Sequence, residues 1–282
     1  MFTNNYYKGI FLKRLINEES LVAVDYADRF IHISIDDTIE IFDDITRNNY
    51  KSIFENDTLK FLKYLHDTYG AKFSMYCFYS FNGIELKNTT DNFRPEFEEN
   101  SDWLKFGYHA KNNEIDYMIV DENVALNDYN LVINELKRIV GEKSITTVLR
   151  LEKFIISEEN VRAINSHEYP IAGLLGADTK DRTDYYLNNE ENEILFNEDY
   201  YYDTENDVFF YNTDLRIEKI KLKNIDNETN KLISDKNIIV FTHEWMFDTL
   251  KNKVATKIKM IKICEFAVEN GYIFSFPDKQ KV

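Results

Sequence analysis

The chain has 282 residues, of which 44% are hydrophobic and 15% aromatic, so it can bury a large core and is not of a disordered composition. It carries 34 Lys and Arg against 50 Asp and Glu, and the resulting net charge of −16 disfavours nucleic acid and anionic membrane surfaces as partners. Only 8 Gly and 3 Pro are present, which excludes a long flexible linker, so we expect a single domain over residues 1–282.

The first residues, MFTNNYYKGIFLKRLIN, do not combine a charged leader with a long apolar run, and no stretch approaches the ~20 apolar residues of a membrane span. We therefore expect a cytoplasmic chain without a membrane span. Cys77 and Cys264 each lie in an apolar run, which favours two buried thiols over a disulfide or a metal pair.

Apolar runs alternate with segments of helical periodicity along the chain. In chain order we expect a strand at 30–35, a helix at 57–69, strands at 71–81 and 103–110, a helix at 127–140, a strand at 146–152, a helix at 157–167, strands at 171–177 and 237–244, a helix at 252–269 and a strand at 272–276. The segment 180–236 is dense in Tyr, Asn and acids, and we expect an insertion of loops and short strands there.

Alternation of strands and helices predicts parallel βαβ units. Six or seven strands leave two architectures open, an incomplete barrel and a doubly wound sheet. No G-x-G-x-x-G motif follows the first strand, so nothing supports a dinucleotide site. In either architecture the carboxyl ends of the strands form one mouth, where ligands bind.

Polar side chains follow five of the expected strands. They are Asp36 and Asp37, Tyr108 and His109, Arg150 and Glu152, Asp178, and His243, Glu244 and Trp245. Because the carboxyl ends of parallel strands converge, we expect these side chains to line one site.

The first of these strands suggests different chemical roles for its two acids. Three isoleucines alternate with His32, Ser34 and Asp36, so if the isoleucines pack against helices, these polar residues point inward. Asp37, one residue on, leaves the strand end in a different direction. One carboxylate can then bind a divalent metal while the other stays free as a base. A metal with Asp and His ligands lowers the pKa of bound water and polarises a carbonyl.

Taken singly, these residues also have structural interpretations. An Asp-Asp pair after a strand is typical of a helix cap or a turn. His109 alone is compatible with a surface histidine, and His243 with a core histidine bonded to a backbone carbonyl. We assign His32 to packing inside the fold, and we assign no site role to His66 or His167.

Two motifs resemble those of NodB-type polysaccharide deacetylases, SIDD at 34–37 and FTHEW at 241–245. A closer resemblance is to a divergent deacetylase-like subgroup linked to surface-polysaccharide biosynthesis. It rests on DWLKFGYHAKN at 102–112, TTVLRLE at 146–152, AGLLGADTKDRTDYYL at 172–187 and TDLRIE at 213–218, and the whole resemblance spans about residues 28 to 275. It implies a distorted, incomplete (β/α) barrel that removes an acetyl group from an N-acetylated sugar with one divalent metal.

The resemblance also implies roles for individual residues. Asp36 takes the place of the base that activates water, Asp37 and His109 those of metal ligands, and His243 that of the acid that protonates the leaving amine. Arg150 is the nearest candidate for the arginine that tunes the base. We expect the remaining polar residues at these strand ends to bind the carbohydrate substrate, namely Tyr108, Asp178 and Trp245.

The third metal ligand departs from the family pattern. The family has a second histidine three or four residues after the first, where this chain has the segment 112–114, NNE, and Asn is a poor zinc ligand. The subgroup has a histidine near position 152, where this chain has Glu152. Glu can replace that histidine, and the set Asp37, His109 and Glu152 suits Zn first, with Mn, Fe, Co or Ni as alternatives. The same change also fits a relative that has lost metal and activity.

Three functions follow from these residues. The first is a metal-dependent carbohydrate N-deacetylase. The second is a non-catalytic relative that binds carbohydrate or a partner protein, supported by the missing second histidine and by the aromatic-rich segment 185–211, because aromatic rings stack on sugars. The third is a glycosidase in which Asp36 or Asp37 pairs with Glu152 or Glu244. Histidines at two strand ends argue against the third.

Overall fold

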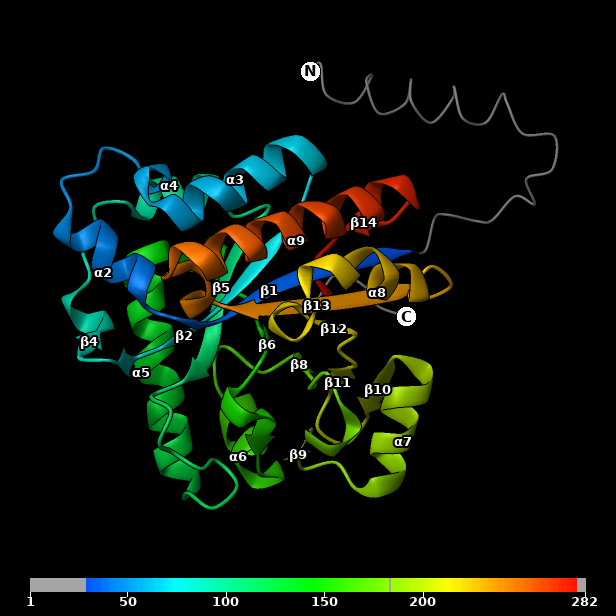
Figure 1. Cartoon of the computed structure of the whole chain (residues 1–282). Coiled ribbons are helices and arrows are strands. Elements are labelled where there is room, and N and C mark those ends of the chain that lie inside the picture. The colour runs from blue at the N-terminus through cyan, green and yellow to red at the C-terminus, as the bar shows by residue number, and fades with distance from the viewer. Residues whose placement is uncertain (1–28, 183, 278–282) are drawn as a thin grey trace.

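The computed structural model of the chain describes residues 29–182 and 184–277 (Figure 1). The N-terminal stretch in which we expected no leader lies outside the described residues. Within the described ranges, no helix combines the length and the apolar character needed to cross a membrane.

A parallel sheet of six strands forms the upper half of the molecule in Figure 1. Five strands follow in the order β12–β13–β1–β2–β5, and the sixth, β14, pairs with the start of β1, all in parallel. The strands are β1 (Phe30–Thr38), β2 (Phe73–Phe78), β5 (Leu104–Ala110), β12 (Leu215–Arg216), β13 (Asn237–His243) and β14 (Ile273–Phe274). Nearly every residue of β1 and β2 is buried, as expected of parallel strands covered on both faces.

A smaller sheet lies below it, in the order β10–β11–β8–β6. Its strands β6, β8 and β11 are parallel, whereas β10 forms an antiparallel hairpin with β11. Two further strand pairs, β3 with β4 and β7 with β9, have two residues in each strand. The bounds are β3 (Ser80–Phe81), β4 (Ile84–Glu85), β6 (Val148–Leu149), β7 (Ile155–Ile156), β8 (Gly173–Leu175), β9 (Asp184–Tyr185), β10 (Tyr200–Asp203) and β11 (Val208–Tyr211).

Two links join the sheets into a distorted ring. On one side the contact is an isolated parallel bridge between Phe106 of β5 and Ile145, just before β6. On the other side the chain 208–216 changes partner, because β11 pairs with β8 and β12 pairs with β13. The predicted α/β fold around a parallel sheet is confirmed, and its strands form an incomplete ring.

Eight α-helices are assigned in the described ranges, and they cover the outside of the ring. Helices α3 and α9 contact each other over one face of the six-stranded sheet, and α5 packs on β5 and α6 (Figure 1). The bounds are α2 (Glu40–Arg47), α3 (Asp57–Tyr69), α4 (Arg94–Glu99), α5 (Glu122–Val140), α6 (Glu158–Asn165), α7 (Asn189–Glu198), α8 (Ile225–Lys231) and α9 (Leu250–Glu269). Short 3-10 turns lie at Ile53–Glu55, Leu86–Asn88, Glu142–Ser144, Glu152–Phe154, Lys180–Arg182, Ile217–Lys219, Leu222–Asn224 and Glu244–Phe247.

Capping residues set the start of two of the predicted helices. Helix α3 has the expected bounds, with Asn56 accepting hydrogen bonds at its start and left-handed Gly70 at its end. Helix α5 begins at 122 rather than 127, because Asp121 caps it. Buried Cys77 and Cys264 are free thiols, as expected.

Other elements differ from the expectation. The strand expected at 146–152 is reduced to β6, and helices α2 and α4 were not predicted. The segment 180–236 contains two helices as well as loops and short strands, and its strands β11 and β12 belong to the ring. Helix α7 has a capping box between Asn188 and Glu191, a sequence signal in a stretch where we expected loops and short strands.

Glu244 joins the end of β13 to the start of α2. Its carboxylate accepts hydrogen bonds from the backbone N–H groups of Ile39, Glu40 and Ile41, at 2.6 to 2.8 Å. The residue that precedes α2, Ile39, has no capping side chain of its own, so a buried acid from another element satisfies these donors. This contact fixes the chain that follows Asp36 and Asp37.

We expect Glu244→Ala to lower the free energy of unfolding by about 2–4 kcal/mol, because it leaves buried N–H donors without acceptors. Urea unfolding followed by circular dichroism measures this change. The matched control is Glu269→Ala at the exposed end of α9, for which we expect a change within about 0.5 kcal/mol. Equal effects of the two substitutions would contradict the capping role.

Candidate active site

The end of β1 departs from regular strand geometry at the paired acids. The pairing of β1 with β2 shifts register between Ile35 and Thr38, and Asp37 has a φ of 59°. This left-handed conformation is uncommon for a residue other than glycine. The irregularity breaks the alternation of side chains, so consecutive acids Asp36 and Asp37 both reach the mouth of the ring.

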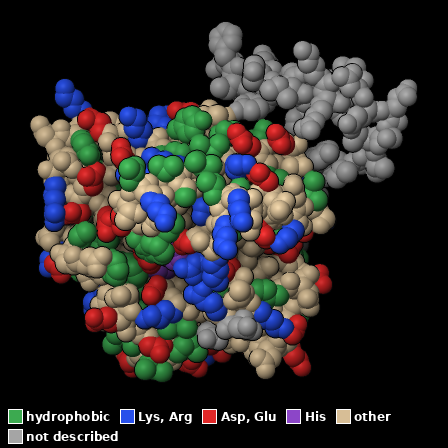
Figure 2. Space-filling model, in the orientation of Figure 1, with side chains coloured by type: hydrophobic (Ala, Val, Ile, Leu, Met, Phe, Trp, Pro, Cys, Tyr) green, Lys and Arg blue, Asp and Glu red, His purple; other side chains and the backbone are tan. Residues whose placement is uncertain are grey.

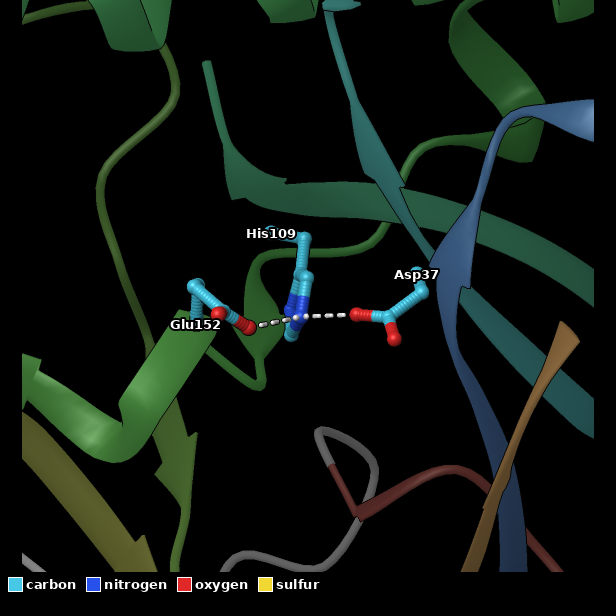
Figure 3. Close-up of side chains that lie close together, drawn as sticks. All are labelled: Asp37, His109 and Glu152. Carbon is cyan, nitrogen blue, oxygen red and sulfur yellow. Dashed lines mark hydrogen bonds and ion pairs between the residues drawn. The ribbon is translucent and has the colours of Figure 1, made fainter. Parts of the chain in front are cut away.

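Three side chains from different elements meet at this mouth. They are Asp37 of β1, His109 of β5 and Glu152 of the turn after β6, and one ligand atom from each lies within 4.8 Å of the others. Figure 3 shows the two carboxylates approaching the imidazole of His109 from opposite sides. The Nε2 atom of His109 lies 3.2 Å from Asp37 Oδ1 and 3.2 Å from Glu152 Oε2.

The protonation of His109 decides what these three groups can hold. Its Nδ1 lies 2.5 Å from the carbonyl oxygen of Arg150, which can only accept, so Nδ1 carries a proton. A neutral ring would then direct the Nε2 lone pair at two carboxylate oxygens. Burial lowers the pKa of His109, but hydrogen bonds with Asp37 and Glu152 outweigh burial and raise the pKa to about 10. The cluster therefore needs a cation at Nε2, either a proton or a metal ion.

One imidazole nitrogen and two carboxylate oxygens form a suitable donor set for a divalent metal. The hydrogen bond from Nδ1 to a backbone carbonyl is the usual support for a ligating histidine. The ring of Phe78 packs edge-on against His109 at 4.9 Å and restricts its rotation. Side chains and their supports thus fit the ion implied by the resemblance.

The turn that carries Glu152 is also strained. Lys153 and Phe154 both have a φ of 59°, and such residues each cost on the order of 1–3 kcal/mol. Phe154 is buried, and its ring packs against Phe241 at 6.2 Å, which holds the turn in place. The strand expected at 146–152 ends early because this turn directs Glu152 toward His109.

Asp36 forms an ion pair with Arg150 below the cluster. Arg150 Nε lies 3.3 Å from Asp36 Oδ2, and both side chains are almost completely buried. The guanidinium also donates to the carbonyl oxygen of Gly176 and to the Thr213 hydroxyl, and reaches Ser34 Oγ at 3.5 Å. A buried cation held by so many acceptors has one orientation, and it fixes that of Asp36.

Asp36 has the properties of a general base. Burial raises its pKa to about 6, although Arg150, His109 and His243 oppose this rise. Its second oxygen, Oδ1, accepts no hydrogen bond from any described residue. A carboxylate with a pKa close to neutrality and one free oxygen can take up a proton from a bound reactant.

His243 lies opposite Asp36 in the pairing of β1 with β13. Its Nδ1 is hydrogen-bonded to Glu218 Oε1, which leaves Nε2 for the mouth. The indole of Trp245 lies beside the ring and donates to Asp37 Oδ2 at 3.1 Å. Asp36 and His243 therefore come from neighbouring strands, with the metal-ligand candidate Asp37 next to both.

Two site residues were missed by the sequence analysis, Glu218 and Thr213. Both lie in the motif TDLRIE, which we quoted for its resemblance without assigning roles to its residues. Thr213 lies in the irregular segment between β11 and β12, and Glu218 lies in a 3-10 turn, so no periodic pattern places them. The motif itself was the only available signal.

The three residues expected to bind substrate have different positions. Tyr108 is buried and packs edge-on against Tyr117 and Tyr129, on the face of β5 that does not carry His109. Its predicted contact with substrate does not fit this placement. Trp245 is 40% exposed beside the cluster, where a substrate can reach it.

Asp178 follows β8 and is almost fully buried. Its carboxylate forms ion pairs with Lys219 at 2.6 Å and with Arg182 at 3.4 Å. It lies at the mouth of the ring but is already neutralised by its own chain.

No family model and no curated protein matches the sequence. Solved structures similar to this chain include a family 4 carbohydrate esterase from Streptomyces lividans in complex with acetate, at 8% identity and a TM-score of 0.42 over 88% of this chain and 93% of that one. A peptidoglycan deacetylase from Bacillus subtilis has 12% identity and a TM-score of 0.43 over 88% of each chain. A polysaccharide deacetylase from Bacillus cereus has 12% identity and a TM-score of 0.35 over 89% and 94%.

His32 lies deeper in the ring than the cluster and is completely buried. Its Nδ1 is 3.1 Å from the carbonyl oxygen of Ser275, and its ring packs against Phe276. Burial and the charge of Arg150 lower its pKa to about 3, against the hydrogen bond with Ser275. His32 is therefore a neutral packing residue, as we expected.

This burial makes stability depend on pH. Between about pH 6.5 and pH 3 the unfolded chain binds a proton at His32 that the folded chain does not, so stability falls as pH falls, by up to about 1.4 kcal/mol per pH unit. We expect His32→Gln to remove this contribution to the change of the free energy of unfolding with pH, measured by urea unfolding at pH 7, 6 and 5. The control His167→Gln changes an exposed histidine and leaves the slope as it is. An unchanged slope in His32→Gln would contradict the neutral buried state.

Proposed function

We propose that the chain is a metal-dependent hydrolase that removes an acetyl group from an N-acetylated sugar of a polysaccharide or glycan precursor. The observation that carries this proposal is that the carboxylates of Asp37 and Glu152 both approach Nε2 of His109, next to the buried carboxylate of Asp36. The motif resemblance leads to the same reaction from the sequence.

Each ligand candidate would contribute one atom to a zinc ion, namely Oδ1 of Asp37, Nε2 of His109 and Oε2 of Glu152. When bound, such an ion polarises the amide carbonyl of the substrate and makes water a better nucleophile at neutral pH. His109 and Asp37 are held in place before any ion binds, because the backbone carbonyl of Arg150 accepts from His109 and the indole of Trp245 donates to Asp37.

The two proton transfers fall to residues on neighbouring strands. Oδ1 of Asp36 takes a proton from the attacking water as its oxygen bonds to the amide carbon. The C–N bond then breaks, and Nε2 of His243 gives a proton to the departing amine. The ring carries both protons before this transfer and keeps the one on Nδ1, toward Glu218, after it. Glu218 keeps the ring of His243 oriented, and Arg150 keeps Asp36 oriented. The products are acetate and the free amino sugar.

The other two functions have less support from the described residues. Glu244 binds three backbone N–H groups of α2 and Glu152 faces His109, so neither is free to act as a glycosidase acid. In the aromatic segment 185–211, Tyr185 and Phe210 belong to the core and cannot stack on a sugar, whereas Tyr202 is 38% exposed. The deacetylase remains the best supported function.

The direct test is acetate release from N-acetylated oligosaccharides by zinc-loaded protein. We expect Asp36→Asn to reduce the rate at least ~100-fold, because the proton acceptor is lost, while bound zinc measured by mass spectrometry stays the same. The control Asp67→Asn, an exposed acid on α3, leaves both quantities unchanged.

Metal removal gives an independent arm of the same assay. Treatment with a chelator abolishes acetate release, and added zinc restores it. Acetate release that survives in metal-free protein or in Asp36→Asn would contradict the proposal, and so would zinc-loaded protein that releases no acetate from any of the oligosaccharides.

A further inference from the structure

A cavity of about 330 Å³ lies beside the proposed acid, between the end of β8, strand β12 and helix α8. Charged side chains dominate its wall, with cations Arg216, Lys219 and Lys221 and acids Asp178, Asp214 and Glu228. On the face drawn in Figure 2, Lys and Arg side chains gather beside a histidine. A concentration of cations is unexpected in a chain with a net charge of −16.

The cavity is coupled to the site through Arg216. This residue pairs in register with Phe241 of β13, so its side chain leaves the sheet on the same face as Phe241 and, two residues on, His243. Arg216 Nε lies 3.6 Å from Glu218 Oε1, the same oxygen that is hydrogen-bonded to His243 Nδ1. A ligand that contacts Arg216 in the cavity is therefore linked to His243 through Arg216 and Glu218.

The first acid in the wall does not cancel these cations. Asp178 has a side-chain exposure of 6% and is shared between Lys219 and Arg182, so this group of three keeps one positive charge. Lys219 is 49% exposed and Arg182 41%, and these cations face the solvent while the carboxylate does not.

The other two acids are also engaged. Asp214 accepts a hydrogen bond from the Ile239 N–H at 2.7 Å, and burial raises its pKa to about 7, which reduces its negative charge at neutral pH. Glu228 forms an ion pair with Lys231 at 2.7 Å. Among the cations of the wall, Arg216 is already paired with Glu218. Lys219, which shares Asp178 with Arg182, and Lys221 are left to receive a ligand, an arrangement suited to an anion.

A second cavity, which lies beside α2 and the turn after β13, has the opposite character. It measures about 630 Å³, and its wall includes Glu40, Asp43, Asp44 and Asp248. An anionic ligand is repelled there, so charge alone directs it to the cavity beside Arg216.

We propose that the cavity beside Arg216 is a subsite for an anionic group of the substrate, a phosphate or a carboxylate carried close to the acetamido sugar. This inference rests on the proposed function and narrows the substrate class to anionic N-acetylated glycans or glycan precursors. The volume suits a phosphate or carboxylate together with part of a sugar ring. Lys219 and Lys221 near a single anion supply binding energy that a neutral sugar lacks.

The test compares three ligands of zinc-loaded protein by calorimetry at fixed ionic strength. They are N-acetylglucosamine, its 1-phosphate, and a disaccharide of N-acetylglucosamine with glucuronate. We expect at least one anionic ligand to bind ten or more times as tightly as the neutral sugar, and the two anionic arms distinguish phosphate from carboxylate. In a double variant, Lys219→Gln with Lys221→Gln, we expect this preference to fall below about threefold.

The control Lys63→Gln removes a cation on α3 and keeps the full preference. Binding of a phosphate to zinc contributes equally in the wild type and the double variant, so the loss of preference reports the cavity alone. The inference is overturned if neutral and anionic sugars bind equally, if no anionic sugar binds, or if the preference survives in the double variant.

Acetate release separates this inference from the proposed function. Release from N-acetylglucosamine oligosaccharides without any preference for anionic ligands would leave the deacetylase standing and remove the subsite. Anion binding that depends on Lys219 and Lys221, without acetate release from any ligand, would keep the subsite and remove the deacetylase.

Discussion

Arg150 connects the two halves of the site, and the rest of the arrangement depends on it. Its backbone carbonyl accepts from His109 and thereby aims Nε2 at two carboxylates, while its guanidinium pairs with Asp36. The side chain is completely buried, so it needs acceptors on every side, and Asp36, Gly176 and Thr213 provide them. One residue thus sets the geometry of both the metal-ligand candidates and the base.

Three of the six left-handed residues other than glycine in the described ranges lie at or next to the ligand candidates, and the other three are Asn82, Asp199 and Asp207. Asp37 has a left-handed conformation, and so do Lys153 and Phe154 immediately after Glu152. Each is unfavourable alone, on the order of 1–3 kcal/mol, and each is held by surrounding structure, the parallel pairing of β1 and the buried Phe154 ring. The strain brings two carboxylates to one imidazole, a placement that regular strands would not give.

Much of the site could be predicted from the sequence because the fold has parallel strands. Asp36, Asp37, His109, Glu152 and His243 each follow an apolar strand or the turn after it, and the carboxyl ends of such strands meet. The prediction that Tyr108 contacts substrate overlooked the alternation of side chains along a strand. Tyr108 and His109 are consecutive, so if His109 faces the site, Tyr108 faces the opposite side of the sheet.

The remaining parts had weaker signals. Thr213 lies in the irregular segment before β12 and Glu218 in the 3-10 turn after it, and these segments are too short to leave a periodic pattern. Helix α2 follows β1 directly and is capped by Glu244, which is far away in the sequence. The sequence before α2 therefore holds no capping residue that would predict where the helix begins. The periodicity of hydrophobic residues along the sequence does not predict long-range contacts of this kind.

The central claim is that Asp37, His109 and Glu152 together hold one divalent metal ion. Anomalous diffraction at the zinc edge from crystals of zinc-loaded protein tests it most directly. The account predicts one peak about 2.0–2.2 Å from a carboxylate oxygen of Asp37, from Nε2 of His109 and from a carboxylate oxygen of Glu152. A zinc-loaded crystal without a peak at this position, or with a peak that Glu152 does not reach, would contradict it.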